Sequence, residues 1–154
     1  MTAPAHYAIG AASALLIQKY LPDGSSQEAR IAWALGIAIA SHVAADAIPH
    51  AEHFLRGRYL GVELIVETIV MLAVLVGASR SPFVAAIILA GMVGAAIPDI
   101  LGMLSRCVDW PALSWADDKM HLFHGKLNLF YANFFLQLVI TVLCSIYVRI
   151  ESAR

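Results

Sequence analysis

The sequence predicts an all-α protein, a polytopic bundle of about five hydrophobic helices that lies in a membrane. Of its 154 residues, 60% are hydrophobic and 14% are charged, whereas a soluble domain is about 45–50% apolar and about a quarter charged. Ala, Leu, Ile and Val dominate long runs that show no strand-like alternation. We find no internal repeat, so residues 1–154 are expected to form a single domain. The net charge of −1 gives no electrostatic argument for nucleic-acid binding.

The first two helices are expected at 4–21 and 27–48. Pro4 suits a helix start, and residues 22–26 (Pro-Asp-Gly-Ser-Ser) read as a turn. A membrane span needs about 20 mostly apolar residues, so the second helix qualifies and the first is short. Because the first carries Gly10 and Ser13, we expect it to pack among the other helices.

Three further helices are expected at 60–78, 82–104 and 127–150, each long enough to span a membrane. Pro98 should kink or break the fourth. Residues 105–119 are expected to form the longest loop, where Trp110 and Trp115 would anchor the membrane interface. Small residues that favour close helix contact in lipid are Gly36, Gly91, Gly94, Ala95 and Ala96. Gln137 and two asparagines of the last helix are expected to hydrogen-bond across the bundle.

The stretch 41–50 carries the clearest chemical signal. His42 and Asp46 are four residues apart and share one helix face, and His50 follows just after Pro49. An imidazole and a carboxylate one turn apart can offer two ligands to a divalent metal. The alternative is a buried His–Asp hydrogen bond without a metal.

Up-and-down threading brings the other polar groups to the same end of the bundle, because starts of odd helices and ends of even ones share a membrane face. Glu63 and Glu67 lie one turn apart within an apolar segment, where carboxylates are costly unless they are paired and where two like charges repel. A bound cation, or protonation of one glutamate, removes this problem. The groups that we expect to converge are His6, His42, Asp46, His50, Glu63, Glu67, Asp99, His121 and His124.

His6, the His42–Asp46–Pro49–His50 pattern, Pro98–Asp99 and His121–His124 together resemble a group of small bacterial integral membrane proteins. These carry an HxxxDxxPH segment and are described as metal-dependent hydrolases. The ligand order is also similar to that of the all-helical, zinc-dependent phospholipase C. In that comparison Glu63 and Glu67 stand where an HxxxE pair would be expected, and Met1 does not match the terminal ligand of the phospholipase.

The resulting hypothesis is a membrane-embedded, metal-dependent hydrolase of a phosphoester, such as a phospholipid head group. A metal pair would polarise the phosphoryl group and lower the pKa of a bound water. The expected metal ligands, for one or two ions of zinc, are His6, His42, Asp46, Glu63, Glu67 and His121. Asp99 is the candidate base or bridging ligand, and the candidate substrate-binding residues are His50, His124 and Arg58.

Two other classes stay open. One is a non-catalytic metal-binding membrane protein, either an ion carrier or a subunit with a structural metal. The other is a scaffold whose polar cluster only joins the helices. Lys and Arg divide five against five between the two ends of the bundle, so the positive-inside rule gives no orientation. We expect the protein in a bacterial inner membrane.

Overall fold

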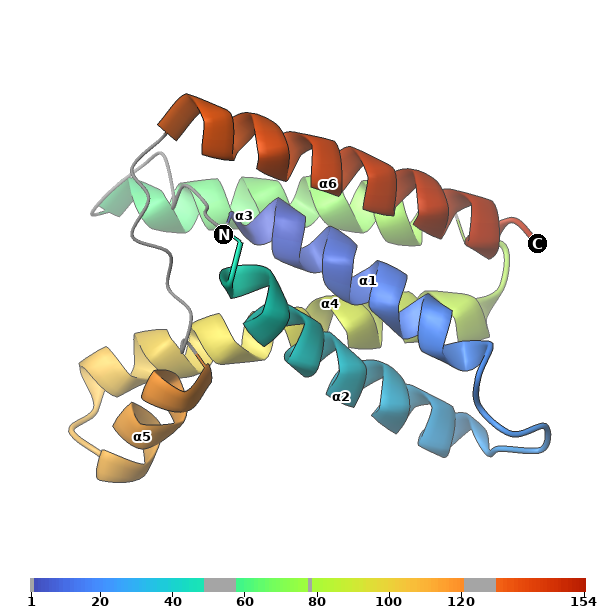
Figure 1. Ribbon diagram of the computed structural model, residues 1–154, viewed down its shortest axis with the longest axis horizontal. Helices are drawn as coiled ribbons and strands as arrows, with labels where there is room; N and C mark the ends of the chain where they lie inside the picture. Colours follow the sequence, from blue (N-terminus) through green and yellow to red (C-terminus); the bar gives the residue numbers. More distant parts are fainter. Residues whose placement is uncertain (1, 49–57, 78, 121–129) are drawn as a thin grey trace.

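The chain folds into packed helices. The computed structural model describes residues 2–48, 58–77, 79–120 and 130–154, and within these residues it contains helices and no strands (Figure 1). The all-α prediction is therefore confirmed. The elements are α1 (Ala3–Gln18), α2 (Gln27–Asp46), α3 (Arg58–Met71) with a π-helical continuation η1 (Leu72–Val76), α4 (Pro82–Cys107), α5 (Pro111–Met120) and α6 (Phe130–Ser152).

Local sequence signals explain the first two helices. Pro4 lies in the first turn of α1, where its missing N–H costs nothing. The turn to α2 includes Gly24 with a φ of 88°, a left-handed conformation that favours glycine. Ser26 then caps α2 by accepting a hydrogen bond from the Ala29 N–H at 3.2 Å.

Helix α1 lies at the centre of the bundle. It packs against α2, α4, α6 and α3 (Figure 1), and four of its alanines, Ala5, Ala8, Ala11 and Ala14, are fully buried. Such small side chains let the neighbouring backbones come close. The expectation that the first helix packs among the others is confirmed.

Two close backbone approaches join α4 to α1 and α2. A Cβ on Gly91 would lie 2.6 Å from the Gly10 carbonyl oxygen, and a Cβ on Gly94 would lie 2.6 Å from the Leu35 carbonyl oxygen. Neither distance leaves room for a side chain. The prediction of close contact is thus confirmed for Gly91 and Gly94 and is wrong for Gly36, which has no neighbour within 4 Å of the same position.

The outer helices present apolar surface. Among the described residues, three segments are long and apolar enough to cross a membrane: Tyr59–Val76, Pro82–Ser105 and Phe134–Ser152. Only 17% of the first and 11% of the last is buried inside the bundle, so their Val, Ile and Leu side chains suit a lipid environment. These spans are consistent with a membrane protein. Helix α2, which we expected to span, is not among them, so about five spanning helices are not confirmed.

The second half of the chain differs from expectation in two places. Helix α4 continues through Pro98 to Cys107, so the break expected as one alternative does not occur, and the kink stays a prediction. Residues 105–119 do not form a loop, because α5 occupies Pro111–Met120. Pro111 suits a first helical turn, and the Trp110 carbonyl accepts hydrogen bonds from the N–H groups of Leu113 and Ser114. These local signals override the polar composition on which we based the loop.

The glycine contacts predict opposite effects for one substitution at two sites. Gly91→Ala should destabilise the protein by about 1–3 kcal/mol, because the new methyl group collides with α1. Gly36→Ala should be neutral or stabilising by up to about 1 kcal/mol, because alanine favours a helix and meets no neighbour. Thermal unfolding in detergent measures both. A Gly91→Ala variant as stable as wild type would contradict this packing.

Candidate metal centre

Three helices contribute four polar side chains to one cluster. His6 comes from the first turns of α1, His42 and Asp46 lie one turn apart at the end of α2, and Asp99 comes from α4 just after Pro98. His6, His42 and Asp46 are 2%, 0% and 1% exposed. The Asp99 side chain is 46% exposed. The cluster is therefore buried on one side and open at Asp99.

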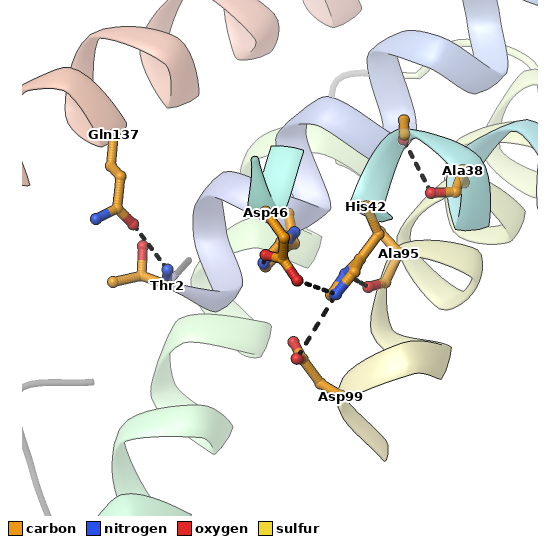
Figure 2. Close-up of polar contacts among 9 residues, drawn as sticks. Thr2, Ala38, His42, Asp46, Ala95, Asp99 and Gln137 are labelled. Carbon is orange, nitrogen blue, oxygen red and sulfur yellow. Dashed lines mark hydrogen bonds and ion pairs between the residues drawn. The ribbon is translucent and has the colours of Figure 1, made fainter. Parts of the chain in front are cut away.

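The ring of His42 is held in one orientation. Its Nδ1 lies 2.7 Å from the Ala95 carbonyl oxygen. A carbonyl can only accept, so Nδ1 carries the hydrogen. The other nitrogen, Nε2, then faces two carboxylates, with Asp46 Oδ2 at 3.3 Å and Asp99 Oδ1 at 3.7 Å (Figure 2). A second hydrogen-bond partner that fixes the imidazole in this way is the usual arrangement of a metal-binding histidine.

His6 stacks on His42. The ring centroids are 3.9 Å apart and the planes differ by 16°. His6 Nε2 lies 3.4 Å from Asp46 Oδ1, which is longer than an ordinary hydrogen bond. Neither ring nitrogen of His6 makes a hydrogen bond to any described residue. A buried polar group without such a bond costs free energy, and a cation beside the ring would remove that cost.

Burial and the neighbouring charges tune His6 and Asp46, which both lie outside the three candidate spans. Burial lowers the pKa of His6 to about 4, against the opposing effect of Asp46. Burial acts to raise the pKa of Asp46, but its contacts with His42 and His6 outweigh this and hold the pKa below its usual range. At neutral pH His6 is uncharged and Asp46 is ionised, and these are the forms that bind a metal.

The contacts within the cluster are longer than charge-assisted hydrogen bonds and similar to the separation of ligand atoms around a metal. With metal–ligand distances of about 2.0–2.1 Å, tetrahedral ligand atoms lie roughly 3.3 Å apart. The three contacts above, at 3.3, 3.4 and 3.7 Å, are close to this value. Charge-assisted hydrogen bonds would be shorter, at about 2.7–2.9 Å.

Ligand atoms of His6, His42 and Asp99 all lie within 4.8 Å of one another, so these three residues could hold a metal ion. Asp46 contacts both histidines but does not belong to this mutually close set. The donor set of imidazoles and carboxylates suits zinc and similar divalent ions. The side chains of the cluster are thus suitable ligands for a divalent metal ion. The identity of the ion stays a prediction.

The structure brings only some of the predicted residues together. Glu63 and Glu67 lie on α3 within a candidate span and do not belong to the set of His6, His42 and Asp99. Helix α3 does contact α1 beside His6, where the Tyr7 hydroxyl lies 3.0 Å from Thr68 Oγ1. The Thr68 hydroxyl already donates to the Leu64 carbonyl at 2.7 Å, so Tyr7 is the donor.

The structure does not describe the side chains of four candidate site residues. His50, His121 and His124 lie outside the described residues. Arg58 begins α3, and its side chain also lies outside what the structure describes. Their proposed roles stay predictions.

One contact of the site could not be identified from residue types. The orienting group of His42 is the backbone carbonyl of Ala95, and no residue type in the sequence indicates it. A contact that the sequence did predict joins α6 to the start of α1. Gln137, 1% exposed, accepts a hydrogen bond from the Thr2 N–H at 2.8 Å, which confirms that Gln137 bonds across the bundle.

No protein-family model, no curated protein and no solved structure matches this chain. The resemblance to HxxxDxxPH-type membrane proteins and to phospholipase C therefore stays a prediction from motifs.

The geometry predicts which carboxylates retain the metal. In purified protein loaded with zinc, Asp46→Ala should lower the bound metal at least tenfold, because Asp46 contacts both histidines. Glu67→Ala should keep the ion at His6 and His42, because Glu67 lies outside that group. Metal content measured by mass spectrometry distinguishes them, and Asp23→Ala in the α1–α2 turn is the matched control. Equal metal in all four proteins would contradict this site.

Proposed function

We propose that the protein is a membrane-embedded, metal-dependent hydrolase that acts on a phosphoester. The observation that carries the proposal is the orientation of His42. Its Nδ1 is occupied by a backbone carbonyl, and its buried Nε2 faces Asp46 and Asp99 beside the stacked ring of His6. Two imidazoles and two carboxylates at this spacing form a typical ligand set for zinc.

We assign His6, His42 and Asp46 to holding the ion and Asp99 to the open side of the site. A divalent ion bound there would supply a Lewis acid for a phosphoryl oxygen. Ala95 keeps the His42 ring in place through its carbonyl. Asp99 would accept the proton of the attacking water, because its side chain is the exposed member of the cluster.

The exposure of Asp99 favours catalysis over a purely structural metal. Structural zinc sites are closed, whereas catalytic ones keep a position open to water or substrate. Here three members of the cluster are buried and the fourth is 46% exposed. This asymmetry would let a substrate approach from the side of Asp99.

The depth of the site supports a lipid substrate. Asp99 lies six residues before Ser105, the end of a candidate span, or about 9 Å along the helix axis at 1.5 Å per residue. Asp99 would then lie about as far from the middle of this span as from its end, within one leaflet of the bilayer and not at its centre. We therefore propose a phospholipid phosphoester as substrate and a bacterial inner membrane as the location.

The remaining sequence candidates complete the proposal. Glu63, Glu67 and His121, the other metal ligands expected from the sequence, would hold a second ion. His50, His124 and Arg58 would bind the substrate phosphate, because histidine and arginine donors suit this anion.

A second candidate function is a non-catalytic metal site, either structural or for ion transport. The observation that favours it is the near-complete burial of His6, His42 and Asp46, which is typical of a closed site.

The hydrolase proposal predicts metal-dependent cleavage of a phosphodiester such as bis(4-nitrophenyl) phosphate by the detergent-purified protein. A chelator should abolish the activity, and zinc or manganese should restore it. Asp99→Asn should lower kcat by about 10²–10⁴-fold, because the variant loses its proton acceptor. Asp23→Asn is the control and should act as wild type does.

Two results would contradict the proposal. If the protein binds metal but cleaves neither this ester nor phospholipids, the non-catalytic function is favoured. If Asp99→Asn retains full activity, the role of Asp99 is wrong.

A further inference from the structure

A cavity of about 230 Å³ lies at the end of the bundle opposite the metal cluster. It is bounded by the end of α1, the start of α2, the start of α4 and the end of α6, near the C-terminus in Figure 1. One wall is apolar, and polar side chains line the rest. The residues of the apolar wall are Leu15, Phe83, Val84 and Ile87, and the polar ones are Gln18, Lys19, Arg30 and Glu151.

The polar side of this cavity is cationic. Glu151 pairs with Lys19 at 2.9 Å and also with Arg154 at 3.0 Å. Arg30 lines the same cavity without a carboxylate partner among the described residues. Of the charged side chains that line the cavity, two are cations and one is a carboxylate, and this excess of positive charge favours an anion.

Arg30 keeps most of its hydrogen-bonding capacity. Among the described residues it donates only to the carbonyls of Ser25 and Pro22, at 3.4 Å in both cases. A guanidinium has five N–H donors, so three are left for a ligand. Arginine is well suited to phosphate because its donors can bind two oxygens at once.

Gln18 offers a hydrogen-bond acceptor to a ligand, whereas Arg30 offers donors. Its Nε2 donates to the carbonyls of Ala14 and Arg30, while its Oε1 is buried and accepts no hydrogen bond from any described residue. A ligand group that donates a hydrogen bond would satisfy this oxygen. A ligand that matches this cavity therefore combines an anionic group, a hydrogen-bond donor and an apolar portion.

The cavity also lies at a membrane boundary. Phe83 and Val84 follow Pro82, the first residue of one candidate span, and Glu151 precedes Ser152, the last residue of another. Two independent spans thus place the cavity at the level of lipid head groups. Basic pockets between helices at this level attract anionic lipids.

We infer that this cavity binds the head group of an anionic phospholipid, with the beginning of an acyl chain against Val84 and Phe83. Arg30 and Lys19 contact the phosphate, and Gln18 Oε1 accepts from a head-group hydroxyl such as that of phosphatidylglycerol. At about 230 Å³ the cavity is smaller than pockets that enclose a whole drug-sized ligand. It therefore holds the head group and leaves most of both chains in the bilayer.

Native mass spectrometry of the detergent-purified protein, with phosphatidylglycerol or phosphatidylcholine added, tests this inference. We expect wild type to retain phosphatidylglycerol at least tenfold more tightly than phosphatidylcholine. Arg30→Gln should abolish the preference. Arg80→Gln is the matched control, because Arg80 is an exposed arginine just before α4 that does not line the cavity, and it should keep the preference.

A second variant and a competitor separate the other possibilities. Val84→Phe fills the apolar wall and leaves the charges in place, so it should weaken retention of phosphatidylglycerol even if Arg30→Gln does not fold. Millimolar inorganic phosphate should not displace the lipid. Equal binding of the two lipids, equal loss in Arg30→Gln and Arg80→Gln, full retention by Val84→Phe, or displacement by phosphate would each overturn the inference.

Discussion

The close approach of α4 to α1 and α2 determines where the buried polar groups of this protein meet. Gly10 and Gly91 let α1 and α4 touch through their backbones, and Gly94 does the same for α4 and α2. His6, His42 and Asp99 are carried on these three helices. The same contact brings the Ala95 carbonyl to 2.7 Å from His42, so that packing of small residues fixes both the position and the tautomer of a candidate ligand.

Helix periodicity and threading were enough to predict the centre of the site. The i, i+4 spacing of His42 and Asp46, and the shared end of the bundle, correctly bring His6, His42, Asp46 and Asp99 together. They do not determine how a helix is rotated about its axis. The two glutamates of α3, which share the expected end, do not join the mutually close set.

Other structural features depend on contacts that cannot be predicted from the residue types alone. The sequence predicts a loop where α5 forms, because the prediction followed the polar composition of residues 105–119 and not Pro111 as a helix start. Gly36 and Gly91 look alike in the sequence, yet only Gly91 touches another helix. The cationic cavity joins residues from four helices that are far apart along the chain, and its individual arginine and lysine look like ordinary interfacial charges.

X-ray absorption spectroscopy of the zinc-loaded protein tests the central claim most directly. The account predicts a low-coordinate ion with two imidazole nitrogens and carboxylate oxygen at about 2.0–2.1 Å, with one imidazole lost in His42→Ala and in His6→Ala. An ion bound by sulfur of Cys107 or Cys144, a shell of oxygen alone, or no specific binding of zinc would contradict it.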